Sequence, residues 1–292
     1  GNTFVSQLLA GAGGLKEETA STYTIGAVLS APTDNPWLRR LRLSVDYYNI
    51  TLADGISQQG VDSVYRQCFS GLFNPEYTLN EACRRLSRDS ASGEPILVTV
   101  NFSNLGRVET AGYDVQLDWG VRFEDVGIGL PGTLSTNVNF TYLDKFATTA
   151  DQVAIPLIDF AGTLGGGQVG TNAGSYRWKL FTRVNYSVGG FTAGLQWQHK
   201  PATADASSVT NTNTAITGAP AYDLFNLNTR YAITKQIALR LGVDNLFDKA
   251  PPLIGVDKSV VAGDGRLSGG RIDAGNYDVL GRRYYVGLGL TF

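Results

Sequence analysis

The sequence has no apolar stretch that approaches the roughly 20 residues of a transmembrane helix. It contains one histidine and two cysteines in 292 residues. Charged residues make up only 17% of the chain, against about 25% in a typical soluble domain. The formal net charge of -2 gives no reason to expect a nucleic acid as partner. No serine nucleophile elbow, phosphate-binding loop or metalloprotease helix is present, so neither an enzyme activity nor a cofactor is expected.

What the chain does contain is an alternation of apolar and polar residues, together with 35 glycines and 11% aromatic residues. At a mean hydropathy of -0.07, a membrane-embedded chain must alternate apolar and polar residues along strands, as transmembrane β-barrels do. A strand of about ten residues is long enough to cross a bilayer at a tilt. The last stretch of the chain has this length and places on one face Tyr284, Val286, Leu288, Leu290 and Phe292, and on the other Arg283, Tyr285, Gly287, Gly289 and Thr291.

The end of that stretch is informative. A C-terminal strand that ends in phenylalanine resembles the terminal strand of bacterial outer-membrane barrels, so Phe292 is expected to be the signal read by their assembly machinery. An amphipathic strand at the end of a soluble β protein is the alternative at this point.

The same alternation predicts nine strands in all. Short and long connections follow one another in turn, as in transmembrane barrels with short periplasmic turns and long external loops. External loops are expected near 56–95, 146–174, 201–220 and 247–281, with a helical turn at about Leu79–Leu86. The predicted strands are 23–29, 41–47, 96–121, 134–142, 178–186, 191–197, 225–231, 237–243 and 284–292.

Aromatic residues sort by strand end, which favours a barrel over a soluble core. If the chain ends on the periplasmic side, two aromatic girdles result on the apolar face, as expected where rings meet lipid headgroups. The lower girdle holds Trp119, Tyr186, Phe191, Tyr231 and Phe292, and the upper holds Tyr142, Trp178, Trp197 and Tyr284.

The two cysteines, Cys68 and Cys83, lie close together in the first long loop. An isolated close pair predicts a local disulfide and an oxidising compartment. The alternative is a metal site, which needs two more soft ligands, whereas the single histidine, His199, is distant in sequence.

Three stretches resemble one family. Asn245-Leu246-Phe247-Asp248 resembles the Asn-Leu-Phe-Asp motif at the outer end of the penultimate strand in TonB-dependent outer-membrane receptors. Residues 15–19 are similar to that family's Leu-Lys-Pro-Glu-Thr stretch, with Glu17 in place of proline. Asn104-Leu105-Gly106 followed by Gly112-Tyr113-Asp114 is similar to its Asn-x-Gly and Gly-x-Asp/Glu strand.

The resemblance implies an all-β fold, a transmembrane antiparallel up-and-down β-barrel. Residues 1–292 would be the C-terminal portion of a barrel of about 22 strands, because nine strands would leave unpaired edges in lipid. It implies a bacterial outer-membrane location among lipid, and as partners the protein's own plug domain and N-terminal strands and an inner-membrane TonB-type energising complex. The implied function is active uptake of a small-molecule ligand: a ferric siderophore, cobalamin, an oligosaccharide or a peptide.

Charged residues on the polar face are the candidate lumen wall. In one interpretation they contact an anionic ligand or the plug. In the other they are rows of charges that keep a wide lumen hydrated. A passive porin-like or adhesin-like barrel without a plug remains an alternative, and a barrel-borne hydrolase would need His199 beside a serine. The candidate wall residues are Arg42, Arg183, Arg230, Arg240 and Arg283 together with Asp46, Asp114, Asp118 and Asp244.

Overall fold

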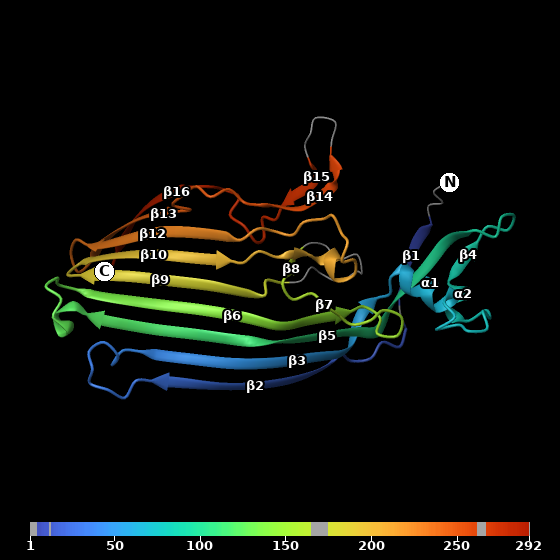
Figure 1. Cartoon of the computed structure of the whole chain (residues 1–292), viewed down its shortest axis with the longest axis horizontal. Coiled ribbons are helices and arrows are strands. Elements are labelled where there is room, and N and C mark those ends of the chain that lie inside the picture. Colours follow the sequence, from blue (N-terminus) through green and yellow to red (C-terminus); the bar gives the residue numbers. More distant parts are fainter. Residues whose placement is uncertain (1–4, 12, 165–174, 262–266, 292) are drawn as a thin grey trace.

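The computed structural model describes residues 5–11, 13–164, 175–261 and 267–291. Nine strands of one antiparallel sheet each pair with the next along the chain, and β2 and β16 are the two edges (Figure 1). The nine strands therefore form an open segment of a barrel wall. They are β2 (Thr19–Ser30), β3 (Arg42–Gln58), β5 (Pro95–Arg122), β6 (Thr133–Thr149), β9 (Trp178–Val188), β10 (Phe191–Lys200), β12 (Tyr222–Ala232), β13 (Ile237–Asp244) and β16 (Arg283–Leu290).

All nine predicted strands are present, but β3 and β6 are longer than alternation indicated. β3 continues to Gln58 and β6 to Thr149, each 17 residues long. Their outer halves pair with β5 beyond the apolar band, with a register shift between Ala111 and Gly112. No apolar face is required there, so the sequence pattern carries no signal for these extensions.

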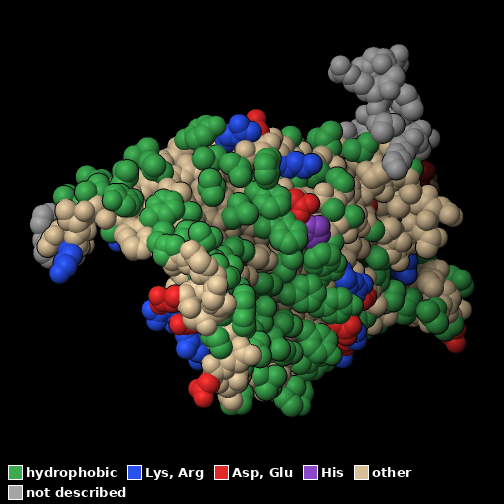
Figure 2. All heavy atoms as spheres, turned by 60° about the vertical axis from the view of Figure 1, so that its left-hand side comes forward, with side chains coloured by type: hydrophobic (Ala, Val, Ile, Leu, Met, Phe, Trp, Pro, Cys, Tyr) green, Lys and Arg blue, Asp and Glu red, His purple; other side chains and the backbone are tan. Residues whose placement is uncertain are grey.

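The two faces of the wall differ sharply. Because register partners in a sheet share a face, the apolar side chains of neighbouring strands gather on one side. Tyr284 is 72%, Val286 75% and Leu288 63% exposed, although all three are large and apolar. Figure 2 shows a broad hydrophobic field on one side of the molecule with charged side chains at its borders. A field of this kind marks a surface that contacts something other than water.

A row of aromatic rings crosses this apolar face near the outer ends of the strands. Tyr47 and Tyr113 lie 5.1 Å apart between ring centroids, and Tyr113, Tyr142 and Trp178 are successive register partners. The row continues through His199, 4.7 Å from Trp178, and then to Trp197, Phe225 and Phe247. Three predicted members of the upper girdle, Tyr142, Trp178 and Trp197, therefore belong to this row.

A second group of rings lies at the opposite ends of the strands. Trp119 stacks on Trp37 at 6.4 Å and donates a hydrogen bond of 2.7 Å to the Trp37 carbonyl. Tyr186 stacks on Phe123 at 5.8 Å, and Phe191 is the register partner of Tyr231. The predicted assembly signal, Phe292, lies outside the described residues, so its role remains a prediction.

The connections alternate as predicted. At one end of the wall lie residues 31–41, 123–132 (with the short helix η1, Phe123–Val126), Gly189-Gly190 and 233–236. At the other end, on the right of Figure 1, lie the long loops 59–94, 150–177, 201–221 and 245–282.

The first long loop builds a small body of its own beyond the wall (Figure 1). It contains α1 (Val61–Phe69), α2 (Glu81–Arg84), β4 (Leu86–Arg88), the start of β5, and β1 (Ser6–Ala10), which pairs with β5 in parallel. The helical turn predicted near 79–86 is α2, whereas α1 was not predicted. None of the helices in the described ranges is long and apolar enough to span a membrane. The core of the small body consists of Val64, Cys68, Ala82, Leu86, Val98 and Val100.

The other three long loops are joined to one another. β7 (Ile158–Asp159) pairs with β6, and β8 (Thr163–Leu164) pairs with β11 (Ala204–Asp205), which precedes the short helix η2 (Ala206–Val209). β14 (Leu253–Val261) and β15 (Leu267–Ile272) form a hairpin that sequence analysis missed. Thr217 exchanges backbone hydrogen bonds of 2.9 Å with Val256 and Gly255, which ties the third loop to this hairpin.

Candidate functional site

The polar face of the wall carries a continuous row of hydrogen-bonding side chains. Each member is the register partner of the next, so the row runs across six strands without interruption. Asn137 donates a hydrogen bond of 2.7 Å to Asp118. The row consists of Arg42, Asp118, Asn137, Arg183, Gln196 and Asn226.

The predicted wall residues all lie on this polar face, but they do not form one cluster. Arg283 is held by Asp278 at 2.8 Å and lies 3.9 Å from Asp244, its register partner. Arg230 and Arg240 lie directly opposite each other on β12 and β13. Arg42 and Arg183 belong to the row across the sheet, so the basic residues are spread over the wall.

Two of the acidic wall residues lie directly beside each other. Asp46 on β3 is the register partner of Asp114 on β5, which places two like charges side by side. Ser44 donates to Asp46 and Thr141 donates to Asp114, each at 2.8 Å. Three of the four predicted wall carboxylates, Asp46, Asp114 and Asp118, therefore lie on β3 and β5, where Arg42 pairs with Asp118. The fourth, Asp244, lies on β13.

The Asn-Leu-Phe-Asp motif is a turn at the outer end of β13. Asn245 and Asp248 have positive φ angles of 52° and 53°, a conformation that asparagine and aspartate tolerate better than most residues. Asn245 is 1% exposed, accepts from the Lys249 backbone N–H at 2.7 Å, and donates to Lys249 O at 3.0 Å and to Asp278 at 3.1 Å. Asp248 accepts from the Arg282 backbone N–H at 2.9 Å, and Phe247 projects onto Phe225 in the aromatic row. The motif therefore closes the base of the last loop.

Asp278 completes this closure. Burial alone would raise the pKa of Asp278, but hydrogen bonds from Arg283, the Leu280 N–H and Asn245 outweigh it and hold that pKa below its usual value. The carboxylate is therefore ionised at neutral pH and pairs with Arg283 at the start of β16.

Replacing Asn245 by alanine should raise the opening rate of the last loop, because it leaves the Lys249 and Asp278 groups without their buried partner. The free energy of opening the last loop should fall by about 1–3 kcal/mol. It should be visible as faster amide hydrogen exchange at Leu246 and Lys249, whereas Asn213→Ala, at an exposed loop position, should have no effect. Unchanged exchange in the Asn245 variant would mean that the motif does not hold the loop.

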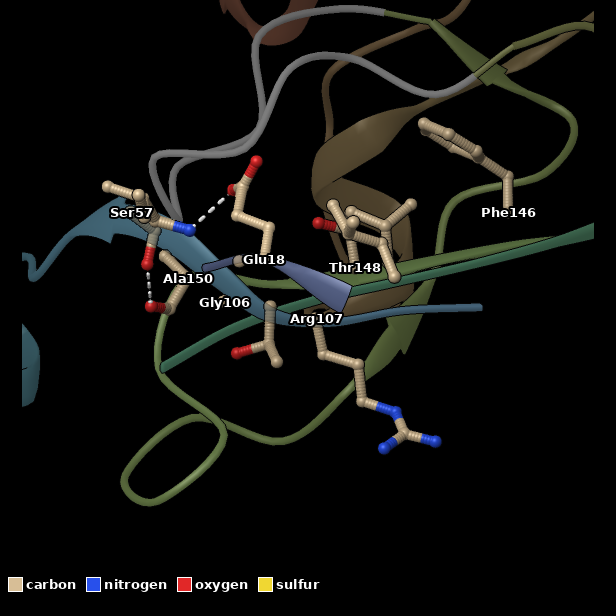
Figure 3. Close-up of a pocket in the computed structure, with 12 residues that line it drawn as sticks. Glu18, Ser57, Gly106, Arg107, Phe146, Thr148 and Ala150 are labelled. Carbon is tan, nitrogen blue, oxygen red and sulfur yellow. Dashed lines mark hydrogen bonds between the residues drawn. The ribbon is translucent and has the colours of Figure 1, made fainter. Parts of the chain in front are cut away.

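A pocket of about 250 Å³ lies between the outer ends of β3 and β6 and the middle of β5 (Figure 3). Glu18 reaches across it and accepts a hydrogen bond of 2.6 Å from the Ile56 backbone N–H, and Ser57 donates to the Ala150 carbonyl. Gly55 and Gly106 let the two strands approach, since a Cβ on Gly106 would lie 2.8 Å from Gly55 O. This volume is just below the range of roughly 300–1,000 Å³ typical of small-molecule sites. The pocket could hold one group of a larger ligand.

A cluster of buried side chains lies under the three joined loops. Lys200, at the end of β10, donates to the Asn276 carbonyl and lies over the rings of Tyr176 and Tyr277, at 5.5 and 5.1 Å from their centroids. Tyr176 and Tyr277 are 3% and 4% exposed, and burial raises the pKa of both phenols, which therefore stay neutral. Leu164, Ala219, Tyr222 and Ile254 complete the cluster. It fixes the loops over the polar side of the wall.

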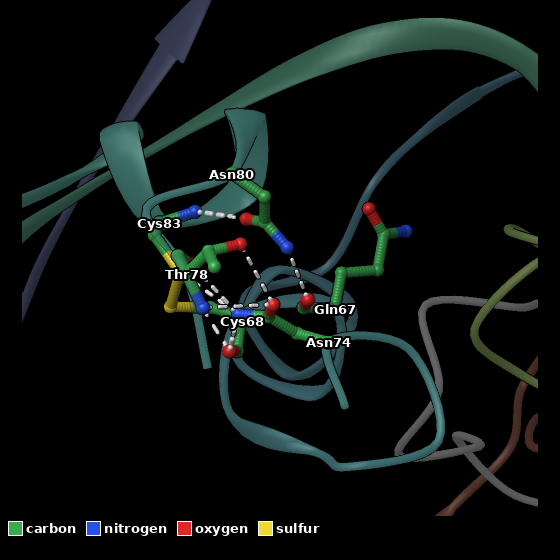
Figure 4. Close-up of a disulfide and its surroundings, with 6 residues drawn as sticks. All are labelled: Gln67, Cys68, Asn74, Thr78, Asn80 and Cys83. Carbon is green, nitrogen blue, oxygen red and sulfur yellow. Dashed lines mark hydrogen bonds between the residues drawn. A yellow bond between two sulfur atoms is a disulfide. The ribbon is translucent and has the colours of Figure 1, made fainter. Parts of the chain in front are cut away.

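The predicted disulfide between Cys68 and Cys83 is confirmed, with their Cα atoms 4.8 Å apart (Figure 4). Asn74 donates to the carbonyls of Cys68 and Thr78, each at 2.8 Å. Asn80 accepts from the Cys83 N–H at 2.9 Å and donates to Gln67 O at 2.9 Å, which joins α2 to α1. The bridge and these two asparagines hold the first loop in one conformation.

His199 lies in the aromatic row on the apolar face. Its Nδ1 is 2.8 Å from Asp223, which also accepts from Trp197 Nε1 at 2.7 Å. Within the described part of the chain, no serine hydrogen-bonds to His199. Its hydrogen-bond partner in this part of the chain is Asp223, and its ring neighbours are Trp178 and Trp197 of the aromatic row.

The spacing of the two aromatic groups matches an apolar layer. On β9, Trp178 and Tyr186 are eight residues apart, about 26 Å of strand, or about 20 Å when tilted by about 40°. Transmembrane barrels have an apolar band about 25 Å tall between aromatic girdles.

A family model described as TonB dependent receptor-like, beta-barrel, matches residues 2–246. The chain belongs to the TonB-dependent receptor family. Barrels of TonB-dependent receptors are outer-membrane proteins.

Solved structures of other TonB-dependent receptors share this fold. The ferric enterobactin receptor PfeA of Pseudomonas aeruginosa matches with a TM-score of 0.56 and 17% identity over 96% of this chain and 32% of its own. The siderophore receptor PirA of Acinetobacter baumannii matches with 0.53 and 17% over 97% and 33%. The iron transporter FrpB of Neisseria meningitidis matches with 0.53 and 12% over 98% and 33%.

These proteins are receptors and transporters, and at such identities the likeness concerns the fold. The chain spans only 32% to 33% of their length. No curated protein matches this sequence.

Proposed function

We propose that this chain is part of the wall of an outer-membrane receptor that takes up a scarce nutrient by TonB-dependent active transport. The receptor would be completed by N-terminal strands and a plug domain and energised by an inner-membrane TonB-type complex. The observation that carries the proposal is the wall itself: a family-matched sheet with an apolar face between two aromatic groups and a charged, hydrogen-bonded opposite face.

A metal chelate of the siderophore type is the ligand class we propose. Its support is that the similar receptors bind or carry ferric enterobactin, a siderophore or iron. The joined loops with Lys200 at their centre, together with the pocket at Glu18, would form the outer vestibule where such a chelate is first captured. Cobalamin, oligosaccharide and peptide are the competing ligands.

Uptake by cells tests both parts of the proposal. The complete receptor gene is expressed in a Gram-negative strain that lacks its own siderophore receptors, with and without a functional TonB. Labelled ferric catecholate, ferric hydroxamate, cobalamin and a maltooligosaccharide are then supplied. We expect accumulation of a ferric siderophore only when TonB is present. Equal uptake without TonB would favour the passive porin-like barrel, and TonB-dependent uptake of another ligand would overturn the ligand class alone.

A further inference from the structure

A buried carboxylate joins the second long loop to the small body on the first. Asp151 directly follows the outer end of β6 and is 0% exposed. Its Oδ2 accepts hydrogen bonds from Gln59 Nε2 at 3.0 Å, from Gln67 Nε2 at 2.9 Å and from the Ser63 hydroxyl. Ser63 and Gln67 lie on α1, the first helix of the small body. One carboxylate oxygen therefore fastens the loop to that helix, and we call these four side chains the latch.

The latch contains no cation. Among the residues that the structure describes, no lysine, arginine or histidine forms an ion pair with Asp151. Its second oxygen, Oδ1, accepts from the backbone N–H groups of Val153 at 3.0 Å and Ala154 at 3.2 Å. Burying a carboxylate charge without a paired cation costs free energy, which hydrogen bonds from neutral donors offset only in part. The docked arrangement of the small body is therefore held by a contact that water could replace.

Two polar atoms next to the latch have no partner at all in the described chain. They are Asn101 Oδ1 and Ser103 Oγ, both buried on β5. The Gln59 backbone N–H donates to the Asn101 carbonyl at 3.1 Å, so these atoms lie beside the latch. A buried polar atom without a hydrogen bond destabilises the arrangement that buries it. Movement that admits water here would hydrate both atoms and Asp151 together.

The sheet is narrow where the small body joins the wall. Residues 55–58 of β3 pair with residues 102–106 of β5, and the register shifts on both sides of Gly55. We call these two ranges the neck, since β2 and β6 end their pairing with β3 and β5 before them. A two-stranded ribbon is marginally stable by itself, and bulged strands bend. The segment that leads from β1 to β2 is tied to the neck by Asn104, which bonds to the N–H and carbonyl of Lys16 at 2.7 and 2.8 Å.

The pocket beside Glu18 has the neck and the latch as its neighbours. Its lining includes two glycines and Ser57 of the neck, and also Ala150, the residue before Asp151 (Figure 3). The Ser57 hydroxyl donates to the Ala150 carbonyl and so closes the pocket on that side. A bend at the neck or release of Asp151 would therefore move the walls of the pocket directly.

We propose that the small body is a gate for this pocket. It is docked by the latch, and it rotates about the neck when Asp151 releases α1. The disulfide and the apolar core make the small body rigid, so it moves as one unit. The open arrangement hydrates the buried polar atoms at the neck and admits a bulky group to the pocket from the side. The gate goes beyond the proposed function and does not depend on how the receptor is energised.

The distance between two spin labels tests the gate in the complete receptor, held in outer-membrane vesicles. The labels are attached to Glu76→Cys on the small body and to Asn213→Cys on the third long loop, both at exposed positions. The native cysteines are joined in the disulfide and take no label. Asp151→Asn then keeps an acceptor for the two backbone N–H groups but turns an amide N–H toward the donors of the latch.

We expect one narrow distance distribution in the native receptor and a second, longer distance in the Asp151→Asn variant. The population of the longer distance should rise about tenfold or more, as for the loss of hydrogen bonds to a charged group. Asp159→Asn is the matched control and should keep the native distribution. Asp159 lies in the same loop but accepts from Phe146 N–H at 2.9 Å and Ala161 N–H at 3.0 Å, in the wall and its own loop.

Unchanged distances in the Asp151→Asn variant would overturn the gate. A broad distribution accompanied by lost amide protection at Val98 would overturn it as well, because the small body would then unfold rather than rotate. Neither measurement uses a ligand or TonB, so the proposed transport function stands or falls separately.

Access to the pocket gives a second measurement. Thr148 lines the pocket, and Thr148→Cys can be labelled with a bulky, membrane-impermeant maleimide. We expect labelling to be several-fold faster when Asp151→Asn is also present, with no change for Asn213→Cys. Equal rates at residue 148 with and without the Asp151 substitution would contradict the proposal.

Discussion

Replacing Leu241 by arginine is expected to destabilise the folded receptor in a lipid bilayer by about 2–4 kcal/mol. Leu241 lies on the apolar face of β13, paired with Val286 and Thr229, and is 42% exposed. In a membrane its surroundings would be acyl chains, where a guanidinium loses its hydration and has no countercharge. Leu239→Arg, two residues along the same strand and face, should give a loss in the same range.

The measurement is the free energy of unfolding in vesicles, from urea titration of tryptophan fluorescence. Asn228→Arg is the matched control, because Asn228 pairs with Gly242 on the polar face at a similar level and its arginine would reach water. We expect that control to change stability by less than about 1 kcal/mol, as for other hydrated surface positions. Equal, small losses in all three variants would show that the apolar face does not meet lipid.

Removing the disulfide should unfold the small body on the first loop while leaving the wall intact. In the chain-entropy model, a bridge that closes a loop of about 15 residues contributes about 3 kcal/mol. The body comprises little more than residues 59–102, a size at which a hydrophobic core alone is marginal. Cys68 is also part of that core at 2% exposure, so Cys68→Ala/Cys83→Ala keeps the site apolar and removes chiefly the cross-link.

Hydrogen exchange reports the two regions separately. We expect the amides of Leu86 and Val98 in the double variant to lose protection, while those of β12 and β13 keep it. Asn74→Ala, which removes the hydrogen bonds to Cys68 O and Thr78 O but keeps the bridge, should give a smaller local loss. Two free thiols in the native protein, or full protection in the double variant, would contradict this account.

The sequence by itself determined the wall. Period-two alternation places Val286, Leu288 and Leu290 on one face whatever surrounds them, because side chains on a strand must point alternately to opposite sides. Nine strands, their directions and the alternation of short and long connections follow from this local rule. The motif at Asn245 and the cysteine pair were equally local signals.

Some features had signals that were present in the sequence but missed. Val61, Val64, Tyr65, Cys68 and Phe69 are spaced as on one face of a helix, and they form α1. Leu253, Ile254 and Val256 lie in β14, and Ile272 lies in β15, which pairs with it. Both elements lie within long loops, outside the run of wall strands that period-two alternation marks.

Only the tertiary structure decided which side chains meet. The parallel pairing of β1 with β5, the joining of three loops around Lys200, and the register that sets Arg230 opposite Arg240 depend on contacts between distant segments. Alternation assigns a residue to a face but not to a partner, since a shift of two residues preserves every face and changes every neighbour. The sequence thus decides which residues lie on each face of the wall, whereas the fold decides which charged residues lie next to one another.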